Sequence, residues 1–259
     1  TMEPVLLEKE GPVARLVLNR PDRRNALSLE MMTKIQEKLD EIARDPHIRV
    51  AILKGNGPAF SAGHDLRELA GEGDDLHRYR EIFSTCSRMM QRFHEIPQPV
   101  IAQVHGVATA AGCQLVAAVD LVVAESGARF QTPGAMLGLF CITPMVPLSR
   151  VIGRRRALDM LFTGRFLTAE EAREAGLVNR VTDPETLEGE TTRWALEIAR
   201  ASRHTLASGK QAFYAQVDLD EPSAYRYAME MMSLQCFAED AREGIEAVLE
   251  KRPPRWKDR

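Results

Sequence analysis

The sequence lacks any long hydrophobic run, and no stretch approaches the ~20 apolar residues that a membrane-spanning helix needs. It also lacks a strong charge of either sign, because 34 basic and 37 acidic side chains leave a net charge of −3. A mildly negative chain without a basic and aromatic patch is not expected to bind nucleic acid or an anionic membrane. The composition, with 44% apolar and 27% charged residues, is ordinary for a globular protein.

Metal-binding and disulfide patterns are missing as well. The four cysteines are widely spaced with no C-x-x-C pair, and the six histidines form no H-x-x-x-H pair. This spacing suits neither a zinc site nor a disulfide framework, so we expect free thiols and no metal. No signal or transit pattern is visible between Thr1 and Pro4, which says little about the compartment.

What the sequence does contain is an alternation of strand and helix patterns. Five short apolar runs predict strands, and the continuous ones are typical of buried parallel strands. These runs cover residues 5–7, 13–18, 50–53, 100–104 and 121–124. Helix patterns cover residues 29–43, with Ser28 as the N-cap, and residues 76–93. The alternation predicts an α/β layered core.

The pattern changes near residue 184, after which one helix pattern follows another. The predicted helices cover residues 187–201, 204–217, 222–237 and 240–249, with no strand pattern among them. We therefore place a boundary near residues 195–200, with residues 1–197 as the core and 198–259 as a helical C-terminal region. The basic, proline-broken tail from Lys251 to Arg259 is either solvated, in contact with another subunit, or in contact with ligand phosphates.

Two glycine-bearing turns each follow a predicted buried strand. They cover residues 58–66, after the strand at 50–53, and residues 105–115, after the strand at 100–104. A strand that ends in a turn of small residues and opens a helix leaves backbone N–H groups unpaired. Such groups can bind an anion or a developing oxyanion. Either turn alone is weak support for a site.

Together and in this order, the turns resemble those of the crotonase (enoyl-CoA hydratase/isomerase) family. The resemblance covers nearly the whole chain, through motifs at Leu18–Pro21, Asn25–Leu27, Phe60–Asp65, Gly106–Leu115, Leu161–Gly164, Ala172–Val178 and Glu243–Arg252. It implies a spiral of ββα units whose helical C-terminal region assembles a homotrimer or a dimer of trimers. The likeness is greatest to a mitochondrial group of the family, which implies a mitochondrial location and a role in fatty-acid metabolism.

The resemblance implies an oxyanion hole for the carbonyl of an acyl-CoA thioester, formed by the backbone N–H groups of His64 and Ala111. Many members carry glycine where Ala111 stands, but alanine can serve if its φ is negative. Coenzyme A would be part of the ligand, and no separate cofactor is expected. The implied coenzyme A contacts are Arg23, Arg24, Ala62, Asp65, Leu66 and Lys210.

The sequence departs from the hydratases where they place two glutamates. Gln114 and Gly134 occupy these two positions, and Ile142 stands where the dienoyl-isomerase type has an aspartate. Hydration needs a water held between two carboxyl groups, and an amide or a glycine cannot exchange its protons. Each general acid or base is typically worth ~100- to 10,000-fold in rate. We therefore do not expect hydration of enoyl-CoA by the usual mechanism.

Few other side chains could take over the proton transfer. The imidazole of His64 is the best candidate, unless only the backbone of this residue takes part. Thr132 and Cys141 flank the empty carboxylate position, but neither is a base without a partner. Gln114 could still hydrogen-bond a bound water or the acyl group.

Three other polar residues near the turns suggest structural roles. His105 ends a buried strand and is expected to be a structural histidine. Asp65, with Glu68 three residues later, has the pattern of a helix cap. Asp120 precedes a strand, and we expect it to satisfy a local turn.

Three functional hypotheses remain open. The first is an acyl-CoA-binding protein without ordinary hydratase activity. The second is an enzyme whose oxyanion hole serves another reaction, such as decarboxylation, thioester cleavage, or weak hydration or isomerisation. The third is a non-catalytic regulatory or scaffold protein.

Overall fold

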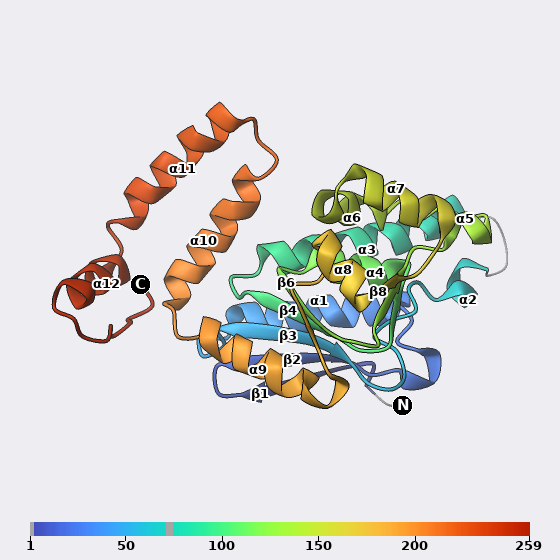
Figure 1. Ribbon diagram of the computed structural model, residues 1–259, viewed down its shortest axis with the longest axis horizontal. Coiled ribbons are helices and arrows are strands. Elements are labelled where there is room, and N and C mark those ends of the chain that lie inside the picture. The colour runs from blue at the N-terminus through green and yellow to red at the C-terminus, as the bar shows by residue number, and fades with distance from the viewer. Residues whose placement is uncertain (1–2, 71–74) are drawn as a thin grey trace.

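The computed structural model describes residues 3–70 and 75–259, which form two sheets covered by helices (Figure 1). The main sheet has the strand order β1-β2-β3-β4-β6-β9. Its strands are β1 (Val5–Glu10), β2 (Val13–Leu18), β3 (Val50–Gly55), β4 (Val100–Val104), β6 (Leu121–Glu125) and β9 (Arg180–Thr182). Only β1 is antiparallel to its neighbour, and the other pairs are parallel. The predicted parallel core is confirmed.

A second sheet contains three very short strands. They are β5 (Val107–Thr109), β7 (Arg129–Gln131) and β8 (Leu167–Thr168), in the order β5-β7-β8. The main-sheet strands β4 and β6 continue into β5 and β7, which lead into helices α4 (Ala111–Ala118) and α5 (Gly134–Leu137). Each passage is one ββα unit, as the family resemblance implies. The small-sheet strands were not predicted, because two or three residues show no periodicity.

Helices cover both faces of the main sheet because its strands alternate their side chains. On β3, Ala51 and Leu53 pack in a cluster with the apolar sides of α1 (Leu29–Arg44) and α3 (Leu76–Glu95). Val50 and Ile52 point to the other face and pack with α9 (Leu187–Ile198).

Helix α1 begins where the sequence predicts. The hydroxyl of Ser28 accepts a hydrogen bond from the backbone N–H of Met31 and so caps the first turn. The apolar stripe of this helix is fully buried and consists of Met31, Met32, Ile35, Leu39 and Ile42. Helix α3 ends two residues later than the sequence predicts.

Short elements between the strands complete the core and were not predicted individually. They are α2 (Leu66–Leu69), α6 (Met145–Ile152), α7 (Arg154–Thr163), α8 (Ala169–Ala175), and the 3-10 helices η1 (Pro21–Arg23) and η2 (Pro184–Thr186).

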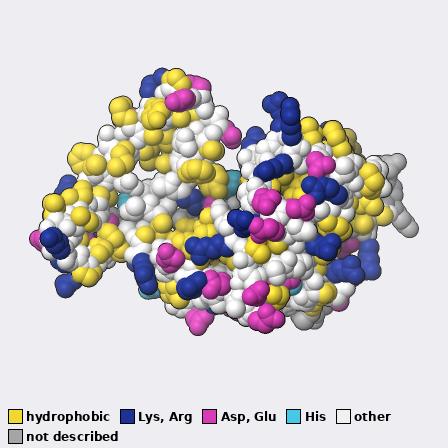
Figure 2. Space-filling model, in the orientation of Figure 1, with side chains coloured by type: hydrophobic (Ala, Val, Ile, Leu, Met, Phe, Trp, Pro, Cys, Tyr) yellow, Lys and Arg dark blue, Asp and Glu magenta, His cyan; other side chains and the backbone are white. Residues whose placement is uncertain are grey.

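The C-terminal helices project away from the two sheets (Figure 1). They are α10 (Arg203–Gln216), α11 (Glu221–Gln235) and α12 (Glu239–Leu249), so the predicted helices are confirmed within a few residues. Helices α10 and α11 bury no large apolar side chain, and Figure 2 shows hydrophobic side chains gathered on this projection. The predicted boundary near residues 195–200 falls at the end of α9, which still packs on the sheet. In the described part of the chain, no helix is both long and apolar enough to cross a membrane.

Candidate functional site

The two glycine-bearing turns lie against each other. Gly63 has a φ of +88°, and a Cβ added there would lie 2.9 Å from the Cβ of Ala110 and 3.1 Å from the nitrogen of Ala111. A parallel bridge between Ser61 and Ala108 joins the same two segments. Only glycine allows this approach, and it brings the backbone of residue 63 next to the start of α4.

Two backbone N–H groups are left unpaired at this contact. Leu27 donates to the carbonyl of Gly63 (2.7 Å) and accepts from the N–H of Asp65 (3.3 Å), which leaves the N–H of His64 facing away from Leu27. Ala111 is the first residue of α4, where an N–H has no acceptor within the helix. Within residues 3–70 and 75–259, neither N–H donates a hydrogen bond. The structure therefore brings the two predicted donors together on adjacent turns.

The turn that presents Ala111 is strained at the preceding residue. Ala110 has a φ of 49° and a ψ of −119°, a region that residues with a Cβ seldom occupy and that costs about 1–3 kcal/mol. Ala111 itself is not among the residues with positive φ, so the condition for an alanine donor is met.

The side chains of His64 and Gln114 lie against successive turns of one helix. The ring of His64 packs edge-on against Phe83, with ring centroids 5.2 Å apart. The Oε1 atom of Gln114 lies 4.0 Å from the Sγ of Cys86, which donates a weak hydrogen bond. Phe83 and Cys86 are three residues apart on α3 and so share a face of that helix. This shared face places both side chains in the same part of the molecule as the two N–H groups.

The surroundings of the His64 imidazole favour its neutral form. Burial lowers its pKa, and the nearby carbonyl of Leu27 opposes this effect only in part. Both ring nitrogens are buried and have no hydrogen-bond partner among the described residues. A neutral imidazole can accept a proton, and an unpaired one is free to bind a ligand.

Gly134 is packed too tightly to carry a side chain. An added Cβ would lie 2.2 Å from the carbonyl oxygen of Leu139 and 2.6 Å from the nitrogen of Cys141. The N–H of Leu139 donates to the carbonyl of Gly134 at 3.0 Å and holds this loop in place. The backbone of residues 139–141 therefore occupies the space that a glutamate at position 134 would need.

The polar neighbours of Gly134 supply no carboxylate and no free base. The hydroxyl of Thr132 is fully buried and has no partner among the described residues. Burial raises the pKa of the Cys141 thiol, which keeps it protonated at neutral pH.

Five of the six predicted coenzyme A contacts come together beside the first turn. The N–H of Ala62 donates to the carbonyl of Arg24 at 2.9 Å, which joins the two segments. Arg23 lies 3.4 Å from the carboxylate of Asp65, and Leu66 is exposed on α2. Asp65 also caps α2 by accepting from the N–H of Arg67, so its predicted capping role is confirmed. Contact of this group with coenzyme A stays a prediction.

Lys210 does not join this group, and its arrangement speaks against the predicted phosphate contact. Its ammonium pairs with Asp120 (2.7 Å) and donates to the carbonyls of Phe93 (2.6 Å) and Gln98 (2.8 Å). These partners use all three of its N–H donors. The side chain is only 7% exposed, so phosphate binding would require a buried ion pair to open.

Asp120 was predicted to satisfy a local turn, but its partners are distant in the sequence. Its carboxylate accepts from the N–H of Val100 and the hydroxyl of Tyr214, both at 2.7 Å, besides pairing with Lys210. Tyr214 in turn stacks on His94. This cluster fastens α10 to the core, and no spacing in the sequence signals it.

His105 and Glu68, both predicted to have structural roles near the turns, make well-defined hydrogen bonds. The Nε2 atom of His105 lies 2.8 Å from the carbonyl of Gly57, so its structural role is confirmed. Glu68 does not close a capping box with Asp65. It accepts from the N–H of Leu29 at 2.9 Å and so satisfies a free donor at the start of α1.

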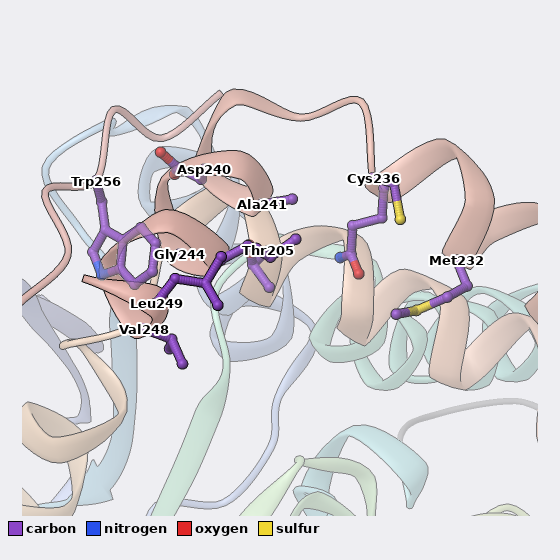
Figure 3. A pocket seen from close by; sticks show the side chains of 11 residues that line it. Thr205, Met232, Cys236, Asp240, Ala241, Gly244, Val248, Leu249 and Trp256 are labelled. Atoms are coloured by element: carbon purple, nitrogen blue, oxygen red, sulfur yellow. The ribbon is translucent and has the colours of Figure 1, made fainter. Parts of the chain in front are cut away.

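A separate apolar pocket lies among the C-terminal helices. Figure 3 shows Met232, Val248, Leu249 and Trp256 at its wall, and its volume is about 460 Å³. Its lining comes from α10, α11, α12 and the tail, away from the two turns. Among the described residues, no cluster of histidine, cysteine and carboxylate side chains could hold a metal.

Comparison with known proteins identifies the family. The family model described as enoyl-CoA hydratase/isomerase matches residues 8–259. The chain belongs to this family. It is 44% identical over 252 residues to the mitochondrial enoyl-CoA hydratase domain-containing protein 3 of Xenopus laevis, covering 97% of this chain and 85% of the relative. It is 32% identical to the 2,3-dehydroadipyl-CoA hydratase of Escherichia coli, over the full length of both.

Solved structures of family members match the fold closely. An enoyl-CoA hydratase from Mycobacterium smegmatis superposes with a TM-score of 0.95 at 43% identity, covering 98% of each chain. Human enoyl-CoA hydratase domain-containing protein 3 superposes with a TM-score of 0.94 at 42% identity, covering 98% of this chain and all of the other. The crotonase-type fold is therefore confirmed.

Proposed function

We propose that this member of the enoyl-CoA hydratase/isomerase family binds acyl-CoA thioesters but does not hydrate enoyl-CoA through a pair of carboxylates. One observation carries the proposal: two unpaired N–H groups, of His64 and Ala111, lie on touching turns. Such a pair can donate two hydrogen bonds to a thioester oxygen and stabilise the negative charge that develops on it, which is the preorganisation that acyl chemistry needs.

The side chains near this pair support the negative half of the proposal. Gln114 cannot release or accept a proton near neutral pH, and Gly134 has no room for any side chain. With no carboxyl group at either position, a bound water would lack both the base and the acid that hydration uses. Substrate binding and hydration are therefore expected to separate in this protein.

Titration with crotonyl-CoA tests the proposal. We expect saturable heat of binding and no loss of the enoyl absorbance over hours. A hydratase that has both glutamates, assayed alongside, shows that the substrate is competent. Hydration at a comparable rate, or the absence of any binding, would show that the proposal is wrong.

A second candidate function is an enzyme that uses the imidazole of His64. The supporting observation is that the ring is neutral, buried and unpaired beside the two N–H groups. Assays with malonyl-type and long-chain thioesters distinguish the candidates. Turnover that is lost in His64→Gln favours the enzyme, whereas binding of every ester without turnover favours a regulatory or scaffold protein.

We also propose a mitochondrial location, a role in fatty-acid metabolism and assembly into homotrimers or pairs of trimers. The printed names of the first relatives support the location. Large apolar side chains exposed on α10–α12 and on the connection between α11 and α12 support assembly, and they include Phe213, Tyr225, Met232, Phe237 and Val248. Light scattering is expected to give three or six times the chain mass, and a monomer would exclude this assembly. Subcellular fractionation of the full-length protein tests the location.

A further inference from the structure

Helix α4 starts at the candidate site and ends where the C-terminal helices are attached to the core. Its first residue is Ala111, whose N–H is a proposed thioester donor, and its last residue is Ala118. The chain then reaches Asp120, whose carboxylate pairs with Lys210 on α10 and accepts from the hydroxyl of Tyr214. One short helix therefore joins the two places.

Helix α3 makes the same connection beside α4. At one end, the Sγ of Cys86 lies 4.0 Å from the Oε1 of Gln114. Eight residues later, about 12 Å along the helix axis, the ring of His94 stacks on that of Tyr214 with centroids 3.8 Å apart. The ring of His94 also lies near the carbonyl of Ala118, the last residue of α4. The ends of α3 and α4 thus meet α10 at one cluster.

This cluster attaches α10 through polar groups. We name its four side chains, His94, Asp120, Lys210 and Tyr214, the α10 joint. Its ion pair is buried, with side-chain exposures of 7% for Lys210 and 14% for Asp120, whereas α10 buries no large apolar side chain. Hydrogen bonds need short distances and defined angles, while apolar contacts are non-directional and can slide. Ordering of the ends of α3 and α4 therefore changes how firmly α10 is held.

We propose that binding of an acyl-CoA ester is coupled, through the α10 joint, to the anchoring of the C-terminal helices α10–α12. The inference rests on the proposed binding of acyl-CoA and adds its consequence for the rest of the chain. Because α10–α12 carry the apolar side chains of the proposed assembly, occupancy of the site then influences contacts with neighbouring subunits.

The coupling acts through the ordering of two helices. An ester whose carbonyl oxygen accepts from the N–H of Ala111 orders the start of α4, and Gln114 carries this effect to α3 at Cys86. Both helices then present fixed ends to the joint, so α10 opens from the core less often. By linkage, a loosened joint weakens ester binding by at most the same factor.

Hydrogen–deuterium exchange read by mass spectrometry tests the coupling, with butyryl-CoA as the ligand. Saturating ester should slow amide exchange in α10 about fivefold, which is the low end of the coupling between linked sites. Helix α9 packs on the opposite face of the main sheet and should exchange at an unchanged rate. Calorimetric titration of the same samples gives the affinity of the ester.

Two variants loosen the joint without emptying it. Tyr214→Phe keeps the ring and removes the hydroxyl that binds Asp120. His94→Phe keeps a ring against Tyr214 and removes the ring nitrogens near Ala118. In both variants the slowing of α10 by the ester should disappear, and the ester should bind about two- to fivefold more weakly. Tyr225→Phe, at a position that is 71% exposed on α11, is the matched control and should behave as the unmodified protein.

The outcomes separate this inference from the proposed function. An ester that binds without slowing exchange in α10 would overturn the coupling while acyl-CoA binding stands. Slowing that persists in both joint variants would indicate direct contact between the ester and α10, and it would also overturn the role of the joint. If no ester binds, the proposed function itself is wrong. Circular dichroism identifies a variant that fails to fold, and the other variant then decides.

Discussion

The candidate site has a backbone half, the N–H groups of His64 and Ala111, and a proton-transfer half, positions 114 and 134. The two halves differ in what fixes their chemistry. The N–H groups of His64 and Ala111 are fixed by the contact of two turns, whatever side chains these residues carry. The proton-transfer half depends on which residues stand at two positions, and here they are Gln114 and Gly134. The comparison teaches that a fold can hold two backbone donors in place while the side chains beside them vary. A variant that alters one half therefore tests whether the other half depends on it.

The largest effect is expected from Gly134→Glu, which attempts to restore a carboxylate. Because a Cβ there would meet backbone atoms of Leu139 and Cys141 at 2.2 and 2.6 Å, the loop must move. We expect a loss of at least ~3 kcal/mol in the free energy of unfolding, measured by urea titration. We also expect no gain of hydratase activity.

Gly189→Glu is the matched control for this variant. Gly189 is an exposed residue of α9, and an added Cβ there meets no atom within 4 Å. Glutamate is a better helix former than glycine, so this variant should be unchanged or slightly more stable. If Gly134→Glu is as stable as this control, the loop yields easily and the described crowding is not what excludes a carboxylate.

Gly63→Ala tests the backbone half. The new methyl group would lie 2.9 Å from the Cβ of Ala110, at a φ of +88° that disfavours alanine. We expect a loss of about 2–3 kcal/mol of stability and a marked loss of affinity for acyl-CoA esters. Gly11→Ala is the control, since Gly11 also has positive φ but no atom within 4 Å of its Cβ position. Esters that bind Gly63→Ala and the control equally would show that the turn contact does not position the donors.

A smaller effect, of opposite sign, is expected at Ala110, the strained residue of the second turn. Ala110→Gly should raise the free energy of unfolding by about 1 kcal/mol, because glycine tolerates the φ of 49°. Ala111→Gly should lower it by about 0.5–1 kcal/mol, because Ala111 is helical and has no strain to relieve. Thermal unfolding of both variants measures the difference. Equal signs would refute strain at Ala110.

The smallest effect concerns pH and the ring of His64. Burial lowers its pKa in the folded state, so below the unfolded value of about 6.5 the unfolded chain binds more protons. Stability is therefore complete above that value and falls as the pH drops toward the folded pKa. His64→Gln should flatten this decline in unfolding experiments between about pH 7 and pH 5.

Two further variants complete the pH experiment. Burial also lowers the pKa of His94, so His94→Gln should remove a separate part of the decline. The exposed His77→Gln serves as the control. A decline that is as steep in His64→Gln as in this control would contradict a buried neutral imidazole.

Much of the fold could be predicted from periodicity. The helix predicted at residues 29–43 is observed at Leu29–Arg44, because its apolar stripe and its cap are both local. Strands β5 and β7 were missed, since three residues carry no pattern and their pairing joins segments about twenty residues apart. Short strands that exist only through such pairing have no local signal.

The site was predictable only in its local parts. The turns that carry His64 and Ala111 could be found from glycine spacing and family likeness. The crowding of Gly134 depends on how residues 139–141 fold back, and the pairing of Lys210 with Asp120 joins positions 90 residues apart. Neither contact follows from spacing, so the sequence did not reveal that the ammonium of Lys210 is already paired.

The most direct test follows the thioester carbonyl itself. Crotonyl-CoA labelled with ¹³C at this carbon is bound to the protein, and its carbonyl stretch is recorded by infrared difference spectroscopy. We predict a shift to lower frequency in the unmodified protein, because two N–H donors polarise the bond, and a smaller shift in Gly63→Ala. No 3-hydroxybutyryl product should appear. An unshifted carbonyl in the bound ester, or steady formation of the hydrated product, would contradict a site with intact backbone donors and no proton-transfer pair.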